Sequence, residues 1–349
     1  DAAAAKAKIE RGIDPQDERQ DYRQAPTFAD LATEYLERHA KVKKRTWQQD
    51  EERLNRDVLP LWRHRKAQDI KRHDVNKLLD RIVDRGALTQ ARLTLALVRK
   101  MFNFGISRGV VEHNPAHLVS PPAKPRQRSR FLASEELRQL WAALERDGSA
   151  MALSFQLRLL TGQRGGEIMR MRWEDVDGDW WTIPGVFTKN ERPHEVFLAP
   201  QAHVVLRRLR ELQGAKLSPW VFPSPKTPGE PMRNFQHAFD RYRDAALQRL
   251  AQDAGKEPNE LPSFTSHDLR RTVASTMTRE LAVQRFIVAQ VLNHKSADRG
   301  VTAIYDRHDY RPEKRDALTR WCDWLEATVA ASPEPALESP QTVPLRLIA

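Results

Sequence analysis

The first large block of the sequence has apolar residues at the spacing of amphipathic helices. From Thr27 to about Val119 they recur every three or four positions, the period that brings side chains onto one face of a helix. The repeats are Phe28, Leu31, Tyr35 and Leu36, then Val75, Leu78, Leu79 and Ile82, then Leu93, Leu95, Val98, Met101 and Phe102. No strand-like alternation interrupts them. The pattern predicts a small helical bundle over residues 27–119.

The second block, residues 131–330, combines helical spacing with a short stretch of a different period. One helix is expected to start at Ser134, with acidic residues in its first turn. Further helices are expected at 151–160, 202–211, 235–250 and 313–329. Three runs rich in β-branched and aromatic residues lie among them, at 180–183, 186–189 and 194–198, and a turn at 190–193 joins the last two. We therefore expect a mainly α protein whose second domain is mixed α+β with a small antiparallel sheet.

Three segments belong to neither predicted core. Residues 1–26 open with an alanine-rich helical run that is expected to stop at Gly12-Ile13-Asp14-Pro15 and to lead into a linker. Residues 120–130 hold three prolines, four cations and no acid, the composition of a semi-stiff basic spacer. Such a spacer would lie along a phosphate backbone and let two domains close around a duplex. Residues 331–349, with four prolines, are expected to be disordered.

The charge balance narrows the choice of partner. The 349 residues carry 58 Lys plus Arg against 47 Asp plus Glu, a net charge of +11 that favours nucleic acid or an anionic membrane. No apolar run approaches the ~18 residues of a membrane-spanning helix, which argues against a membrane as the partner and leaves nucleic acid. Cys322 is the only cysteine, so the chain has no internal disulfide framework or cysteine-based metal cluster, as expected in a reducing cytoplasm. Cations near the predicted helix ends of the first block fit either phosphate contact or ordinary solvated faces: Lys41, Lys43, Lys44, Arg45, Arg63, Arg65, Lys66, Lys71 and Arg72.

The stretch Ser266–Tyr305 gathers side chains that could act on an anion. His267 and Arg270 are three residues apart on a predicted helix and therefore share a face. An apolar run at 286–292 leads into His294, and Tyr305 follows after a polar loop. Two histidines, an arginine and a tyrosine, with little acid among them, suit an anion that is held, attacked and released.

A second cluster lies upstream, at Thr161–Ile168. Arg164 is followed by two glycines, which let the backbone approach a phosphate closely while the guanidinium is held in place. Together with Arg270, Arg164 could grip the two non-bridging oxygens of one phosphodiester. An ordinary helix start, with Arg164 and Glu167 as an i,i+3 ion pair on a solvated face, explains the same residues.

Taken together, these elements resemble the tyrosine recombinase family, also called the phage integrase family. The shared pattern over residues 131–310 is Thr161-Gly-x-Arg164-x-x-Glu167, Lys189 on a β-hairpin, His267-x-x-Arg270, Leu292-x-His294 and Tyr305, in the family's order and approximate spacing. The resemblance implies a SAM-like helical core-binding domain followed by an integrase catalytic domain. It also implies site-specific recombination of double-stranded DNA at attachment sites by a homotetramer, in the nucleoid-associated cytoplasm, with accessory DNA-bending proteins as further partners.

The same resemblance implies a catalytic set, namely Arg164, Lys189, His267, Arg270, His294 and Tyr305. The tyrosine would attack the scissile phosphorus and leave a 3′-phosphotyrosine and a free 5′-hydroxyl. The two arginines and the second histidine would neutralise the phosphoryl oxygens, the lysine would protonate the departing 5′-oxygen, and the first histidine would assist the proton at the nucleophile. No metal, ATP or other cofactor is implied, because guanidinium groups supply the positive charge and the phosphotyrosine bond conserves the energy for rejoining.

Two positions have competitors within the chain. Tyr310 is an alternative to Tyr305, which is favoured by the short apolar run before it and by its place in the family pattern. Lys226 is an alternative to Lys189, which is favoured by its predicted strand context. Both candidate histidines could instead be structural, and two others, His194 and His308, are expected to be non-catalytic.

The chain departs from the family pattern at Asn293, where glycine is usual; asparagine tolerates positive φ better than other non-glycine residues. The interval from His294 to Tyr305 and the segment Gly12–Pro15 resemble integrases of genomic islands and satellite phages, which implies that an N-terminal arm-binding domain is missing. The helix at 313–329 is either a docking element between neighbouring subunits or ordinary core. The rival functions are a type IB topoisomerase-like DNA relaxing enzyme and a DNA-binding regulator without catalysis.

Overall fold

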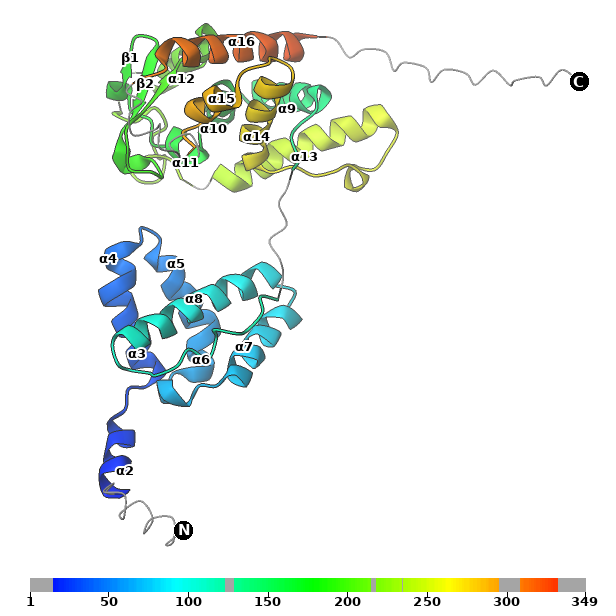
Figure 1. The fold of residues 1–349 in the computed structure, drawn as a ribbon. Helices are drawn as coiled ribbons and strands as arrows, with labels where there is room; N and C mark the ends of the chain where they lie inside the picture. The colour runs from blue at the N-terminus through cyan, green and yellow to red at the C-terminus, as the bar shows by residue number, and fades with distance from the viewer. Residues whose placement is uncertain (1–14, 123–128, 215–217, 234, 295–307, 332–349) are drawn as a thin grey trace, which may run out of the picture. The chain divides into compact units, whose positions relative to one another are not determined.

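The computed structural model describes residues 15–122, 129–214, 218–233, 235–294 and 308–331. The chain divides into two compact units, Asp1–Gln127 and Arg128–Ala349, and each is described here by itself (Figure 1). The alanine-rich run before Pro15, the middle of the basic spacer and the proline-rich tail after Ala331 lie outside the described residues.

The first unit is helical. Its elements are α2 (Pro15–Gln24), α3 (Phe28–Tyr35), a π-helical turn (Leu36–Ala40), α4 (Lys41–Lys43), α5 (Trp47–Arg53), a second π-helical turn (Leu54–Val58), α6 (Leu59–Trp62), a 3-10 turn (Ala67–Asp69), α7 (Arg72–Asp84) and α8 (Leu88–Ser107). The expected helical bundle is confirmed. Part of the segment that is expected to be a linker is helical, because Pro15 begins α2. Proline fits the first turn of a helix, where its missing N–H would have had no helical partner.

Helix α3 shows how sequence and packing agree in this unit. Thr27 and Asp30 form a reciprocal cap, in which the Asp30 carboxylate accepts from the Thr27 backbone N–H at 2.8 Å. The apolar face then buries Phe28, whose ring meets Trp62 edge-on at 5.1 Å between centroids and lies 6.0 Å from Phe102. The core of the unit is therefore closed by three aromatic residues from three separate helices.

The second unit contains the rest of the regular structure. Its elements are α9 (Ser134–Asp147), α10 (Ala150–Thr161), α11 (Gly165–Ile168), a 3-10 turn (Trp173–Asp175), β1 (Val176–Asp177), β2 (Trp180–Ile183), a 3-10 turn (Gly185–Phe187), β3 (His194–Phe197), α12 (Pro200–Gln213), α13 (Phe235–Ala254), a 3-10 turn (Pro258–Glu260), α14 (Ser266–Arg279), α15 (Arg285–Val291) and α16 (Arg311–Ala330). A helical domain with a small sheet is what the sequence predicts, and this fold class is confirmed.

The sheet has the order β1-β2-β3 and is antiparallel throughout, with Trp181 opposite Val196 and Ile183 opposite His194. The strand expected at 186–189 is wrong. That segment begins with a 3-10 turn, and Thr188 donates its hydroxyl to the carbonyls of Gly185 and Arg192 at 3.0 and 2.8 Å. Because these polar groups are satisfied inside the connection, residues 184–193 form a compact loop between β2 and β3.

Helix α16 is part of the core of its own unit. The indole N–H of Trp321 donates to the carbonyl of Leu159 at 2.8 Å, and the thiol of Cys322 donates to the carbonyl of Leu160 at 3.3 Å. Both side chains are almost fully buried, and burial raises the pKa of Cys322. Of the two alternatives for this helix, the structure therefore favours intramolecular core over docking between subunits.

Candidate active site

The first arginine of the candidate site follows a helix end that requires glycine. Helix α10 ends at Gly162, whose φ of +68° is a left-handed conformation that L side chains rarely adopt. A Cβ there would also lie 2.8 Å from Cδ2 of Leu292 and 3.1 Å from Cγ1 of Val273. This turn brings Arg164 to the N-cap of α11.

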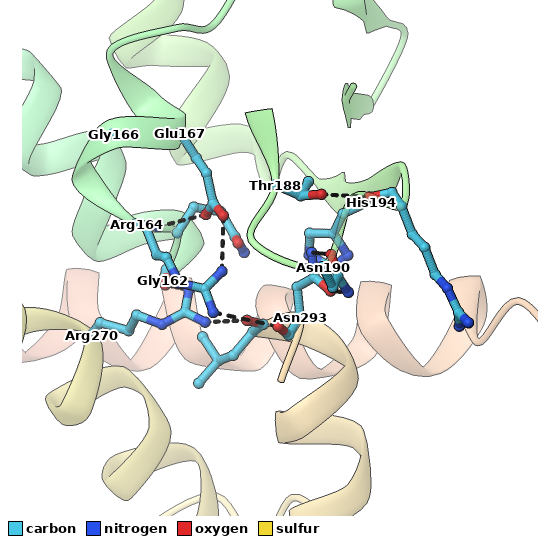
Figure 2. Close-up of polar contacts among 12 residues, drawn as sticks. Gly162, Arg164, Gly166, Glu167, Thr188, Asn190, His194, Arg270 and Asn293 are labelled. Carbon is cyan, nitrogen blue, oxygen red and sulfur yellow. Dashed lines mark hydrogen bonds and ion pairs between the residues drawn. The ribbon is translucent and has the colours of Figure 1, made fainter. Parts of the chain in front are cut away.

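Glu167 fixes the orientation of Arg164. Its carboxylate accepts from the Arg164 guanidinium at 2.8 Å and from the Arg164 backbone N–H at 3.0 Å (Figure 2). The Glu167 side chain is only 4% exposed, against 29% for Arg164. The i,i+3 ion pair considered from the sequence does form. However, it lies at a buried carboxylate and not on a solvated face, so it aims the guanidinium.

The second arginine, Arg270, is buried on α14 and held by two carbonyl groups. It donates to the oxygen of Gly162 at 2.7 Å and to the oxygen of Leu292 (Figure 2). Both carbonyls belong to C-terminal ends of helices, where the helix dipole places partial negative charge. Burial, together with the repulsion of Arg164, lowers the pKa of Arg270 to about 9, so the side chain remains cationic at neutral pH.

The C-terminal end of α15 is where both arginines meet. Three successive carbonyls accept side-chain hydrogen bonds: Val291 from His194 and Gln163, Leu292 from Arg270, and Asn293 from Arg164 at 3.4 Å. Such carbonyls have no partner within their own helix. The structure thus brings the two predicted arginines, from α14 and the start of α11, to one turn of backbone.

The pKa values of the two candidate histidines are lowered, in part by the positive charge of nearby arginines. Burial lowers the pKa of His294 to about 4, and repulsion from Arg270 and Arg164 adds to the effect. Burial and the charges of Arg271 and Arg270 lower the pKa of His267. Both imidazoles are therefore neutral at pH 7, with one nitrogen able to donate and the other able to accept a proton.

Lys189 lies in the β2–β3 loop and is exposed, and no hydrogen bond or ion pair of its ammonium group is found among the residues that the structure describes. The next residue, Asn190, pairs with Asn293. This contact brings the loop to the backbone turn Val291–Asn293 that binds both arginines, called the arginine turn below. The competitor Lys226 lines a different hollow together with Met151, at the N-terminal end of α10. Arg164 follows the other end of this 12-residue helix, about 18 Å away. The geometry therefore favours Lys189.

Tyr305, the predicted nucleophile, lies outside the described residues. Its competitor Tyr310 is described, and it caps the N-terminus of α16 with its ring 5.1 Å from Phe286 and 4.5 Å from His308. Phe286 belongs to the N-terminal end of α15, whereas the arginines hold the C-terminal end of this seven-residue helix, about 10 Å away. The observed position of Tyr310 is thus unsuited to a phosphate held by the arginines.

Several residues of the site were not predicted for the positions they take. Gln163 and His194 share the carbonyl of Val291. The sequence pattern gives no role to Gln163 and predicts only that His194 is non-catalytic. The amides of Asn190 and Asn293 face each other across the site. Their partners come from distant parts of the sequence, so no local spacing could have revealed them. Within the described ranges, no helix could cross a membrane and no group of three or more His, Cys, Asp or Glu gathers at metal-binding distance.

Comparisons with known proteins match most of the chain to integrases. The profile of the "Phage integrase family" matches residues 130–311, and that of the "Phage integrase central domain" matches residues 28–121. Prophage integrase IntA of Escherichia coli is 25% identical over 343 residues, which cover 95% of this chain and 79% of that protein. A lambda integrase dimer bound to a COC′ core site has a similar fold, with a TM-score of 0.64 and 20% identity over 89% of this chain and 86% of the other. A lambda integrase tetramer bound to a Holliday junction also has a similar fold, with a TM-score of 0.64 and 18% identity, over 86% of this chain and 88% of the other.

Proposed function

Because this chain belongs to the phage integrase family, the tyrosine-type site-specific recombinases, we propose that it cuts and rejoins double-stranded DNA at attachment sites through a 3′-phosphotyrosyl intermediate. One observation carries the proposal: Arg164 and Arg270, from separate helices, converge on the same backbone turn. Each guanidinium has five N–H donors, and only some of them bind protein oxygens here. The remaining donors suit the two non-bridging oxygens of one phosphodiester.

The proposed reaction consists of two successive exchanges of one phosphoester bond for another. The phenolic oxygen of Tyr305 bonds to phosphorus while the bond from phosphorus to the 5′-oxygen breaks. The phenolic proton passes to the neutral imidazole of His267, and the 5′-oxygen takes a proton from the ammonium of Lys189. Rejoining is the reverse, with a 5′-hydroxyl attacking the phosphotyrosine. No net energy input is required, because one phosphodiester is made for each one broken.

The transition state carries more negative charge on the phosphoryl oxygens than the starting DNA. Arg164 and Arg270 neutralise that charge from positions already fixed by Glu167 and by helix-end carbonyls, so little reorganisation accompanies the reaction. His294, neutral in the free protein, donates an N–H to the same oxygens. The arriving phosphate counteracts the two arginines, and we expect it to raise the pKa of His294 from its low value.

The wider setting is proposed from the same family membership. The partner is double-stranded DNA, in line with the net charge of +11 and with DNA-bound integrases of the same fold. A lambda integrase of this fold has been seen as a tetramer on a Holliday junction, and we propose four copies on two DNA sites here as well. The protein would act on the nucleoid in the cytoplasm as the integrase of a mobile genetic element, with DNA-bending proteins as accessory partners.

A trapping experiment tests the reaction and the nucleophile together. Candidate attachment-site DNA with a nick next to the cleavage point loses a short 5′-hydroxyl fragment on cleavage, so the covalent adduct accumulates. We expect a denaturation-resistant adduct that maps to Tyr305 and forms equally in EDTA, and Tyr305→Phe should abolish it.

Tyr310→Phe is the matched control and should leave the adduct in place. Binding of the DNA without any adduct would indicate a regulator and would overturn the proposal. An adduct mapped to Tyr310 would show that the wrong tyrosine has been assigned.

A further inference from the structure

Two asparagine side chains face each other across the candidate site. The Asn190 amide donates to Oδ1 of Asn293 at 2.6 Å, and the Asn293 amide reaches back to Oδ1 of Asn190 at 3.4 Å (Figure 2). Both residues are half-buried. A reciprocal amide pair fixes the orientation of both side chains, because each one must present its oxygen to the nitrogen of the other.

The pair stands between two residues of the proposed mechanism. Asn190 directly follows Lys189, and Asn293 directly precedes His294. The carbonyl of Asn293 also accepts from Arg164 at 3.4 Å. Asn293 thus contacts Arg164 through its backbone carbonyl. Through its side chain it contacts residues 184–193, the loop that carries Lys189 and is called the lysine loop below.

The lysine loop is built as one compact piece. Thr188 is buried and ties both sides of the loop together through the carbonyls of Gly185 and Arg192. Gly185 packs so tightly that a Cβ would lie 2.6 Å from the carbonyl oxygen of Glu191. A loop with these internal bonds moves as a unit, so its external bonds decide where Lys189 stands.

Two such external bonds reach the end of α15. His194, at the start of β3, donates to the carbonyl of Val291 at 3.0 Å and holds the base of the loop. The amide pair holds its tip. The turn at Asn293 does not itself require an amide, because its φ of +49° is readily adopted by glycine.

We propose that Asn190 and Asn293 are positioning residues that hold the Lys189 loop against the arginine turn, so that the ammonium group meets the departing 5′-oxygen. This inference rests on the proposed recombinase function. The effect of the pair is on the placement of the proton donor.

The test compares two leaving groups. One DNA substrate carries the natural bridging 5′-oxygen at the cleavage point, and the other carries a bridging 5′-sulfur. A thiolate departs without protonation because a thiol is far more acidic than an alcohol, so the sulfur substrate bypasses the lysine. Single-turnover cleavage is measured for wild type, Asn190→Ala, Asn293→Gly and the double variant, with thermal unfolding as a check on the fold.

We expect each single variant to cleave the oxygen substrate about tenfold more slowly, a partial loss of the ~10²-fold or greater contribution of a general acid. Cleavage of the sulfur substrate should be unchanged. The double variant should be no slower than either single variant, because both remove the same contact. Asn293→Gly preserves the positive-φ turn, which separates loss of the amide from loss of the backbone shape.

Equal slowing of both substrates would overturn the inference, since it would place the defect at the arginines instead of the proton donor. Unchanged cleavage of both would overturn it as well. Lys189→Ala and Tyr305→Phe report on the proposed function separately. If Lys189→Ala slows only the oxygen substrate and Tyr305→Phe forms no adduct, the function stands whatever the asparagine variants do.

Discussion

His194 shows how a residue outside the reaction can shape the site. It is 8% exposed, and because a carbonyl can only accept, its Nε2 must carry the proton shared with Val291. Burial lowers its pKa to about 3, against 6.5 for an ordinary histidine. The folded protein therefore keeps this ring neutral across the range in which the unfolded chain would protonate it.

The stability of the second unit should consequently fall in mild acid. Between pH 6.5 and about 3 the unfolded state binds the proton that folded His194 refuses, so the free energy of unfolding rises with pH throughout this window. At pH 5.0 the loss relative to pH 7.5 should be about 2 kcal/mol from this group, at about 1.4 kcal/mol per pH unit. Urea unfolding at the two pH values measures the loss, and His194→Gln, which keeps an N–H donor, should reduce the difference by about 2 kcal/mol.

The exposed His237 on α13 provides the control, since His237→Gln removes an imidazole that is already in solvent. The lowered pKa values of His267 and His294 act in the same direction and will remain in both variants. Identical pH dependence in His194→Gln and wild type would show that the buried ring is not the source of the acid sensitivity.

At the scale of elements, periodicity predicted helices well and loops poorly. The apolar repeats at 313–329 and 235–250 correspond to α16 and α13, because burial of a stripe fixes both the period and the face. The run at 186–189 has strand composition but is a loop, since Thr188 and Gly185 close it with side-chain and steric contacts that a strand pattern does not encode. Likewise, the sequence placed Arg164 and Arg270 in suitable contexts, but their shared carbonyl turn depends on α15, which is distant from Arg164 in sequence.

The junction of α10, α14 and α15 is the element-scale feature that sets the arginine geometry. Gly162→Ala places a methyl group 2.8 Å from Leu292, the residue whose carbonyl binds Arg270. The positive φ should cost about 1–2 kcal/mol and the overpacking a further ~1–3 kcal/mol. We expect lower stability in urea unfolding and slower DNA cleavage, because Leu292 must shift to admit the methyl group.

Gly178→Ala separates these two costs. Gly178 has a φ of +53° with nothing within 4 Å of the added Cβ, so its substitution introduces the backbone penalty alone. Cleavage by Gly178→Ala should match wild type. If Gly162→Ala and Gly178→Ala lost equal stability, the added methyl group at Gly162 would cause no overpacking cost at the junction of α10, α14 and α15.

At the scale of the whole molecule, the basic spacer between the two units is the feature that most directly concerns DNA. Its four cations do not form one class. Arg130 donates to the carbonyl of Ser263 at 3.0 Å, forms an ion pair with Glu136 and lies 5.7 Å from the Phe264 ring centroid, so it fastens the start of the second unit. The other three, Lys124, Arg126 and Arg128, lie outside the described residues and are known by their charge alone.

This distinction predicts two different effects of neutralisation. If Lys124, Arg126 and Arg128 each bind a phosphate, replacing all three by Gln should reduce the slope of log affinity against log salt by about 2.7, at about 0.9 per phosphate contact. Titration of non-cleaved DNA with Tyr305→Phe protein over a range of salt concentrations measures that slope. Arg130→Gln should leave the slope nearly unchanged and instead lower the stability of the second unit, because its donors are committed to protein oxygens. A slope that is insensitive to the triple substitution would show that the spacer connects the two units without lying along the phosphate backbone, and the net charge of +11 would then act through the surfaces of the folded units.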